Sequence, residues 1–236
     1  MAKLIVTTSW DDGTVPDLKL GELLTEYGVK GTFYIPRFSK RLTLLQKGGL
    51  VALAEHHEIG AHTVNHAHLT LIPPAEAKAE IESSKLFLEG ILAAKISMFC
   101  YPYGEYNAEI KHLVQTCGFS GARTVKFNGL KNISDPYEFG VTVTASNHQP
   151  DETDEIAQYS HAISIKSLSD WELKAKILYD LAFAAGGIWH LWGHSWEIDE
   201  HHDWQKLERV LRYVSNRPEV LYFTNGETVS AQSLTC

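Results

Sequence analysis

Leu4-Ile5-Val6-Thr7-Thr8-Ser9-Trp10-Asp11-Asp12-Gly13 is an apolar, β-branched run that ends in two carboxylates and a glycine. Residues of these types favour strands, so residues 4–10 predict a β-strand. Because successive strand residues point to opposite faces, Asp11 and Asp12 can serve one site only where the strand ends and bends. Gly13 permits such a bend, since glycine adopts backbone conformations that other residues avoid.

Similar strand-like runs alternate with helical patterns along the rest of the chain. We expect strands at residues 4–10, 31–36, 58–62, 97–101, 118–123, 140–145, 187–192 and 220–224. Apolar spacing predicts helices at 16–28, 42–56, 73–94, 107–117, 169–185 and 202–215, and Ser169 with Glu172 forms a capping sequence for the fifth of these. Long loops are expected within 126–167. The alternation implies a mostly parallel sheet, and seven or eight strands indicate closure into an α/β barrel.

Composition limits the class of protein. A chain of 236 residues fits one domain spanning residues 1–236. The net charge of -8, without a Lys/Arg-rich run, argues against nucleic acid or an anionic membrane as partner. No apolar run approaches the roughly 18 residues of a membrane span. Residues 1–3 leave no room for a secretory signal before the first strand, and three cysteines do not make a disulfide framework. We therefore expect a cytoplasmic location, and an oligomer remains open.

A second polar segment, His62-Thr63-Val64-Asn65-His66, follows another short apolar run. Histidines four apart can converge on one ion if the chain turns helically after the strand. One Asp and two His would give a divalent cation such as Zn²⁺ three ligands and an open position. The other Asp would then be free to accept a proton from the activated water. Asp-Gly turns and paired histidines also arise by chance, so the prediction rests on both motifs lying at strand ends.

Two further segments carry chemical groups at strand ends. Residues 99–104 read Phe-Cys-Tyr-Pro-Tyr-Gly, and residues 189–197 read Trp-His-Leu-Trp-Gly-His-Ser-Trp-Glu. Alternation places His190, Trp192 and His194 on one side of their strand, with His194 nearest the end. Active groups of a βα barrel gather at this end of the strands. Aromatic rings there can stack on a sugar, although core packing is the commoner role of a tryptophan; we expect one or two such contacts from Trp10, Tyr103, Trp192 and Trp196.

The order of these motifs resembles the polysaccharide deacetylase family, carbohydrate esterase family 4, over nearly the whole chain. The motifs are Ser-Trp-Asp-Asp-Gly at 9–13, His-Thr-x-x-His at 62–66, Tyr-Pro-Tyr-Gly at 101–104 and Trp-Gly-His at 192–194. The resemblance implies a distorted (β/α) barrel of about seven parallel strands. It also implies metal-dependent hydrolysis of an acetyl group on an N-acetylated or O-acetylated sugar.

The same resemblance implies a role for each motif residue. Asp11 is similar to the general base of the family, and its metal ligands fall on Asp12, His62 and His66. His194 matches the general acid. The oxyanion contact of the family, a backbone N–H, falls on Tyr103.

The chain departs from the family pattern at two positions. Cys100 stands where many members have an arginine that pairs with the catalytic Asp. Arg123, at the end of the expected strand 118–123, is a candidate replacement, and we also group it with Trp10, Trp192 and Trp196 as substrate-binding. Ser195 stands where many members have an Asp after the last histidine, which leaves Glu197 and Asp199 as candidates to orient His194.

Three functions remain open. The first is the metal-dependent sugar deacetylase. The second is a hydrolase of small linear or cyclic amides on the same fold; some such proteins work without metal, but the retained Asp12, His62 and His66 argue against that version. The third is a non-catalytic carbohydrate-binding protein. Retention of Asp11 beside Asp12 favours catalysis, because a binding protein has no chemical need for an unligated carboxylate beside a metal.

Overall fold

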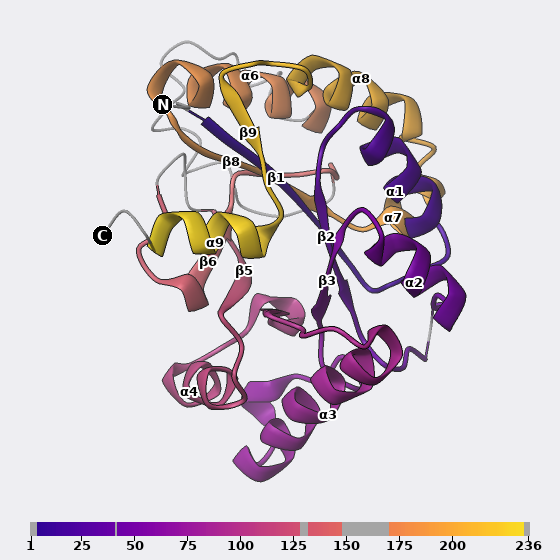
Figure 1. The fold of residues 1–236 in the computed structure, drawn as a ribbon, viewed down its shortest axis with the longest axis vertical. Helices are drawn as coiled ribbons and strands as arrows, with labels where there is room; N and C mark the ends of the chain where they lie inside the picture. Colours follow the sequence, from indigo (N-terminus) through magenta and orange to yellow (C-terminus); the bar gives the residue numbers. More distant parts are fainter. Residues whose placement is uncertain (1–3, 41, 128–131, 148–169, 234–236) are drawn as a thin grey trace.

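A computed structural model describes residues 4–40, 42–127, 132–147 and 170–233 (Figure 1). Every ladder between its strands is parallel. In chain order the strands are β1 (Leu4–Asp11), β2 (Gly31–Ile35), β3 (Glu58–Ala61), β4 (Met98–Cys100), β5 (Gly121–Phe127), β6 (Phe139–Val141), β7 (Val143–Thr144), β8 (Gly187–Gly193) and β9 (Val220–Tyr222). Seven of the eight predicted strands correspond to one element each, and the run predicted at 140–145 corresponds to β6 and β7 together.

The strands form a nearly closed barrel, which confirms the fold class expected from the sequence. Their order is β6-β5-β4-β3-β2-β1-β8-β7. Closure comes from one extended segment, because β6 pairs with β5 while β7, which starts just after Thr142, pairs with β8. The Thr142 backbone N–H donates to the His190 carbonyl at 2.9 Å. The barrel is distorted at β1, whose first half pairs with β9 and whose second half pairs with β2.

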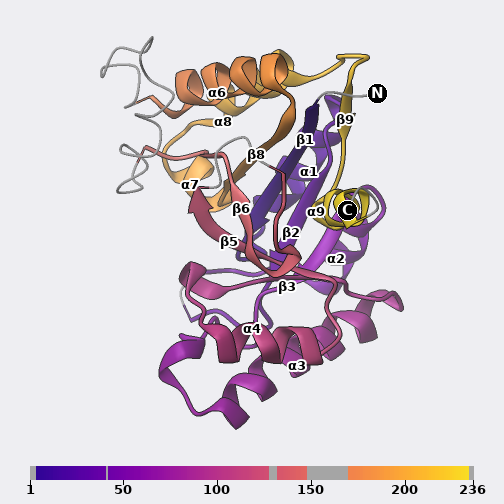
Figure 2. The ribbon, with the colours of Figure 1, turned by 90° about the vertical axis from the view of Figure 1, so that its left-hand side faces the viewer.

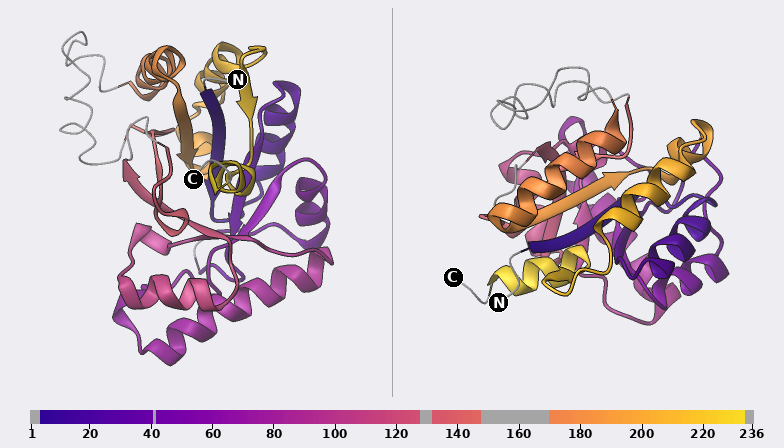
Figure 3. Two further views of the ribbon diagram at one scale, coloured as in Figure 1. Left: turned by 60° about the vertical axis from the view of Figure 1, so that its left-hand side comes forward. Right: turned by 90° about the horizontal axis from the view of Figure 1, so that it is seen from above.

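Helices surround the barrel. They are α1 (Asp17–Glu26), α2 (Lys47–Ala54), α3 (Pro74–Leu92), α4 (Ala108–Thr116), α6 (Trp171–Ala185), α7 (Ser195–Glu200), α8 (Trp204–Val214) and α9 (Asn225–Ser233). Figure 2 shows α3 and α4 together at one end of the molecule, and Figure 3 shows α6 and α8 side by side next to β8. Among the helices of the described residues, none combines the length and apolarity that crossing a membrane requires.

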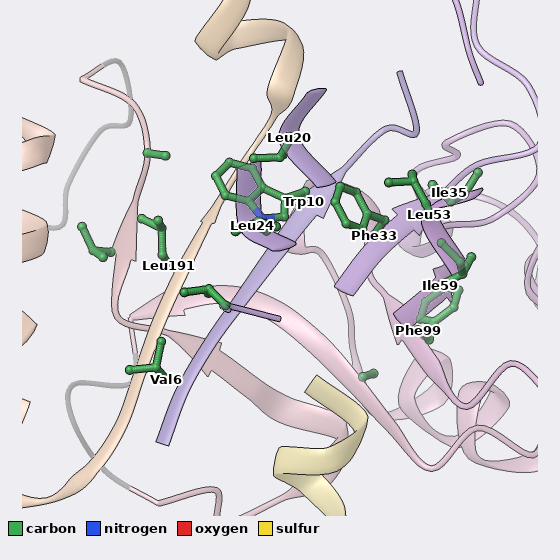
Figure 4. Packing of buried hydrophobic residues seen from close by; sticks show 14 of the residues in the cluster. Val6, Trp10, Leu20, Leu24, Phe33, Ile35, Leu53, Ile59, Phe99 and Leu191 are labelled. Atoms are coloured by element: carbon green, nitrogen blue, oxygen red, sulfur yellow. The ribbon is translucent and has the colours of Figure 1, made fainter. Parts of the chain in front are cut away.

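Strand alternation divides the buried apolar side chains into two cores. The outward residues pack under the helices; Figure 4 shows Trp10 of β1 against Leu20 and Leu24 of α1. The inward residues fill the barrel. This inner core consists of Ile5, Tyr34, Met98, Cys100, Phe139, Ile188 and Val229, the last of which belongs to α9. The inner face of β1 therefore continues through Thr7 and Ser9 to Asp11, whereas Trp10 faces the helices.

Some local expectations were wrong. The N-cap of α6 is Asp170, whose side chain accepts from the Glu172 backbone N–H at 3.2 Å, and Ser169 lies outside the described residues. Strand β5 continues to Phe127, beyond the predicted end at 123. Helices α7 and α9 were not predicted, because both are short and weakly patterned. The loops expected at 128–131 and 148–167 also lie outside the described residues.

Candidate active site

The predicted metal ligands Asp12, His62 and His66 converge at the carboxyl end of the barrel strands. One ligand atom from each lies within 4.8 Å of the other two. Asp12 follows β1, and His62 directly follows β3. The bend after β1 is made by Asp12 and Gly13 together, with φ of 80° and 63°. A side chain at Gly13 would also collide with Ile35, so both conformation and space require glycine there.

The two histidines approach each other by a different route from the one expected. Residues 62–66 do not form a helical turn. The chain instead folds back through left-handed backbone at Thr63 and His66, with φ of 64° and 53°. The ring centroids of His62 and His66 are 4.6 Å apart. The expected convergence is present, but an irregular loop produces it.

His62 is held in the form that binds metals. Its Nδ1 donates to the Cys100 carbonyl at 2.9 Å, which leaves Nε2 as the lone-pair nitrogen. Burial lowers the pKa of His62 to about 4, against the opposing effect of the Asp11 carboxylate. Burial also lowers the pKa of His66. Both imidazoles are therefore neutral near pH 7, as metal ligation requires.

Asp12 accepts a hydrogen bond that fixes its second oxygen. The indole Nε1 of Trp196, in α7, donates to Asp12 Oδ2 at 2.9 Å. Asp12 Oδ1 lies 3.7 Å from His66 Nε2. The carboxylate therefore turns Oδ1 toward the histidines while the indole holds Oδ2. Hydrogen bonds of this kind set the direction of a ligand and are typical of metal sites.

Asp11, the residue before Asp12, forms an ion pair with a buried arginine. Arg123 Nη2 donates to Asp11 Oδ1. Burial alone would raise the pKa of Asp11, but the Arg123 charge and the nearby His62 and His194 outweigh it and hold the pKa at about 2. Asp11 is therefore ionised at neutral pH. Arg123 thus forms with Asp11 the ion pair that, in the family pattern, an arginine at position 100 would form.

Arg123 reaches Asp11 from the strand next to the one that carries Cys100. The two residues are direct register partners of β4 and β5. Arg123 is fully buried, and its guanidinium carbon lies 4.9 Å from the centroid of the Trp192 ring. It does not line the pocket. The expectation that Arg123 contacts substrate is therefore wrong, since it lies behind Asp11, whereas the expectation that it replaces the missing arginine agrees with the contact.

A second set of atoms, from Asp11, His62 and Cys100, also lies within 4.8 Å. Two features make it a poorer metal site. Asp11 is already engaged with Arg123. Burial raises the pKa of the Cys100 thiol well above its ordinary value, and the thiolate is the form that binds metals. The set with Asp12 and His66 is the better site.

His194 lines the same cavity as His62 and His66 and lies close to Asp12. Its Nδ1 bonds Glu197 Oε2 at 2.8 Å, and its Nε2 lies 3.9 Å from Asp12 Oδ2. Burial lowers the pKa of His194, but the Glu197 hydrogen bond and the carboxylates of Asp11 and Asp12 outweigh it, so the net shift is upward. Asp199, the other candidate to orient this ring, instead accepts from Trp204 Nε1. Glu197 thus orients His194 and favours its protonated form.

Tyr103 lies in the pocket wall. It occupies the middle of the turn Pro102–Gly104 and has left-handed backbone, with φ of 59°. Its exposed ring stacks on His68, with centroids 3.8 Å apart, and meets the edge of His66 at 4.5 Å. Gly104 also has positive φ, and a side chain there would collide with Val125. These constraints set the path of the backbone beside the predicted metal ligand His66.

The groups surround one cavity of about 880 Å³. It is lined by Asp11, Asp12, Pro36, Ser39, Lys40, Leu42, His62, Asn65, His66, Tyr101, Tyr103, Gly104, Val125, Trp192, His194 and Trp196. Trp192 and Trp196 are therefore placed as expected for contact with a ligand. Trp10 is not, because it is fully buried on the opposite face of β1 and its Nε1 donates to Thr8 Oγ1 at 3.0 Å. The expectation of a sugar contact at Trp10 is wrong.

Sequence reasoning missed two features of this pocket. Lys40 is one of its lining residues, and a lone lysine in a loop carries no pattern that reveals such a position. Trp196 was expected only as a ring for a sugar, whereas its indole N–H also binds Asp12. Its place two residues after His194 is the one available signal, since α7 begins at Ser195 and keeps Trp196 in its first turn, near the strand end.

Comparison with known proteins agrees with this geometry. A sequence model of the family described as polysaccharide deacetylase matches residues 2–122, just over half of the chain. The chain belongs to the polysaccharide deacetylase family.

Solved structures resemble it over most of its length. One is that of a putative polysaccharide deacetylase from Mycobacterium smegmatis, with a TM-score of 0.73, 16% identity, and coverage of 99% of this chain and 91% of that one. The chitin deacetylase of Colletotrichum lindemuthianum gives a TM-score of 0.63 at 16% identity, covering 97% and 88%. A family 4 carbohydrate esterase from Streptomyces lividans, in complex with acetate, gives 0.58 at 16% identity, covering 94% and 92%. At identities this low, the similarity to these structures shows a shared fold and nothing more.

Proposed function

We propose that this chain is a metal-dependent hydrolase that removes an acetyl group from an N-acetylated or O-acetylated sugar. The observation that carries the proposal is the arrangement around one cavity of two adjacent carboxylates with different partners. Asp12 lies with His62 and His66, while Asp11 is held by Arg123. A binding protein needs only the first group, whereas hydrolysis also needs an ionised carboxylate to accept a proton.

The donor set fits a divalent cation, with Zn²⁺ the favoured ion. It offers one carboxylate oxygen and two neutral imidazole nitrogens, a set typical of catalytic zinc with a further position open. The hydrogen bonds from His62 to Cys100 and from Trp196 to Asp12 turn the ligand atoms toward the common point. A cation bound there would act as a Lewis acid on a water and on the acetyl carbonyl.

The chain's own residues would divide the proton transfers. Asp11, kept ionised by Arg123, would accept the proton of the attacking water. His194, whose pKa is raised, would donate a proton to the nitrogen or oxygen that leaves. The backbone N–H of Tyr103 would donate to the oxyanion. Trp192 and Trp196 would pack against the sugar, and acetate and a free amine or hydroxyl would be released.

Two alternatives share the fold. A hydrolase of small linear or cyclic amides would use the same groups, so only substrate tests separate it from a sugar deacetylase. A non-catalytic carbohydrate-binding protein would retain the pocket walls without need of the proton-transfer groups. The Asp11–Arg123 and His194–Glu197 pairs favour catalysis over binding alone.

The test is acetate release by the purified chain from a panel of N-acetylated sugars, O-acetylated sugars and small amides, with its metal content measured in parallel. We expect about one divalent ion per chain and turnover of an acetylated sugar. Asp11→Asn should retain the ion and lose about 10²–10⁴-fold in rate. Asp180→Asn, a matched change at an exposed residue of α6, should leave the rate unchanged. Full activity of Asp11→Asn would contradict the proposal.

A further inference from the structure

Glu80, on α3, is hydrogen-bonded to the loop between the two histidines. Its Oε2 accepts from the backbone N–H groups of Val64 and Asn65, both at 2.9 Å. Its Oε1 accepts from the Asn65 side-chain Nδ2 at 2.6 Å. One carboxylate thus binds three donors of a segment that begins and ends with a predicted metal ligand. Hydrogen bonds to a charged acceptor are stronger than those between neutral groups.

The loop needs such an external hold. Thr63 has φ of 64° and His66 has φ of 53°. Left-handed backbone is costly for residues with a Cβ, most of all for a β-branched residue such as threonine. It persists only where the surroundings enforce it. On the other side, Phe38 N–H donates to the Val64 carbonyl at 2.8 Å, so the middle of the loop is held between Glu80 and the loop that follows β2.

Glu80 is itself fixed in space. Helix α3 is 19 residues long, and its buried residues Ala77, Ile81, Ser84 and Leu88 pack on the barrel. Glu80 lies next to Ile81, so its backbone belongs to a rigid element. Acceptors on such elements hold a site more closely than acceptors on loops.

We infer that Glu80 is a positioning residue that fixes the 63–66 backbone, and thereby the directions of the His62 and His66 imidazoles toward a shared divalent cation. The inference rests on the proposed function, because it takes both histidines as ligands. Glu80 does not line the cavity and is not itself a ligand. Its contribution is to the affinity of the site, since partners of ligands are typically worth about 10–100-fold in metal affinity.

The test compares Glu80→Ala and Glu80→Gln with the wild-type chain and with matched controls, Glu82→Ala and Glu82→Gln. Glu82 lies two residues further along α3 and is exposed. Each full-length, metal-free protein is titrated with ZnCl₂ by calorimetry, after a thermal melt has shown that it is folded. We expect Glu80→Ala to bind Zn²⁺ about 10–100-fold more weakly than wild type. Glu80→Gln, which retains one acceptor oxygen, should lose less, and both Glu82 variants should match wild type.

A second readout does not depend on metal. Hydrogen exchange at the Val64 and Asn65 amides of the metal-free protein should be faster in Glu80→Ala than in Glu82→Ala, because these amides lose their acceptor. The inference is overturned if exchange is unchanged, or if Glu80→Gln and Glu80→Ala are both folded and bind Zn²⁺ as tightly as wild type. Either result leaves the proposed function intact. A wild-type chain that binds no Zn²⁺ overturns the proposed function and the inference together.

Discussion

The buried pair of Asp11 and Arg123 gives the sharpest energetic prediction. Arg123 is fully buried and Asp11 nearly so. In Arg123→Met, Asp11 would stay buried without its counter-charge, and removal of one partner of a buried pair typically costs about 3–5 kcal/mol. In Asp11→Asn the guanidinium would be the unpaired charge, and its Nε and Nη1 already lack a hydrogen-bond partner within the described residues. Each single change should therefore destabilise the metal-free chain strongly.

The double variant separates this pairing from general loss of packing. Asp11→Asn with Arg123→Met leaves no buried charge, so we expect it to be more stable than the sum of the single changes by about 2 kcal/mol or more. Guanidinium denaturation of the four metal-free proteins measures this coupling. Losses that add to within about 0.5 kcal/mol would refute the claim that the pair acts as a unit.

The same pair makes the stability of the folded protein depend on pH in the acid range. Burial alone would raise the pKa of Asp11, but Arg123, His62 and His194 together outweigh it and hold the pKa at about 2, below its ordinary value of 3.8. A carboxylate whose pKa is lower in the folded state stabilises the folded protein at pH values above its ordinary pKa. That stabilisation is lost as the pH falls through the folded-state pKa. Wild type should thus lose about 2 kcal/mol between pH 4 and pH 2 from this group. Asp11→Asn should lack that component in the same denaturation series.

Three further changes test other parts of the site. Glu197→Gln removes the carboxylate charge that helps to raise the pKa of His194. Because His194 must be protonated to act as an acid, the alkaline limb of the rate profile should move to lower pH, and an unmoved limb would exclude this role. Trp196→Phe removes the donor to Asp12 Oδ2 and should weaken Zn²⁺ binding about tenfold, with calorimetry as the measurement and unchanged affinity as the contrary result. Burial raises the pKa of Asp17 to about 8, so the folded protein loses stability as the pH rises from about 4 to 8. Asp17→Asn should therefore be more stable than wild type by at least about 2 kcal/mol at pH 8, but not at pH 4. Equal melting temperatures of the two proteins at both pH values would contradict this.

The candidate site could be predicted from the sequence because its chemical groups lie at strand ends. Asp12, His62 and His66 each follow a β-rich run, and parallel strands bring such ends to one edge of a barrel. Alternation along β1 also contains the information that Trp10 and Asp11 point to opposite faces. The error at Trp10 came from judging the ring by its type instead of its position.

Other parts of the site depend on contacts between distant segments. The pairing of Arg123 with Asp11 requires the register of β4 against β5, which the pattern of one strand does not contain. Glu80 binds the Val64 backbone N–H from α3, and no pattern in the sequence of that helix distinguishes Glu80 from its other polar residues. Closure through β6 and β7 likewise requires one short segment to pair with two strands, β5 and β8. Tertiary geometry, and not local propensity, decides all three.

The most direct test of the central claim is anomalous diffraction from crystals of this chain soaked in Zn²⁺, recorded on both sides of the zinc absorption edge. We expect one strong anomalous peak, about 2.0–2.2 Å from Asp12 Oδ1 and from one ring nitrogen each of His62 and His66, with Asp11 beside it and unligated. A strong peak held by other residues, with these three side chains unligated, would contradict it.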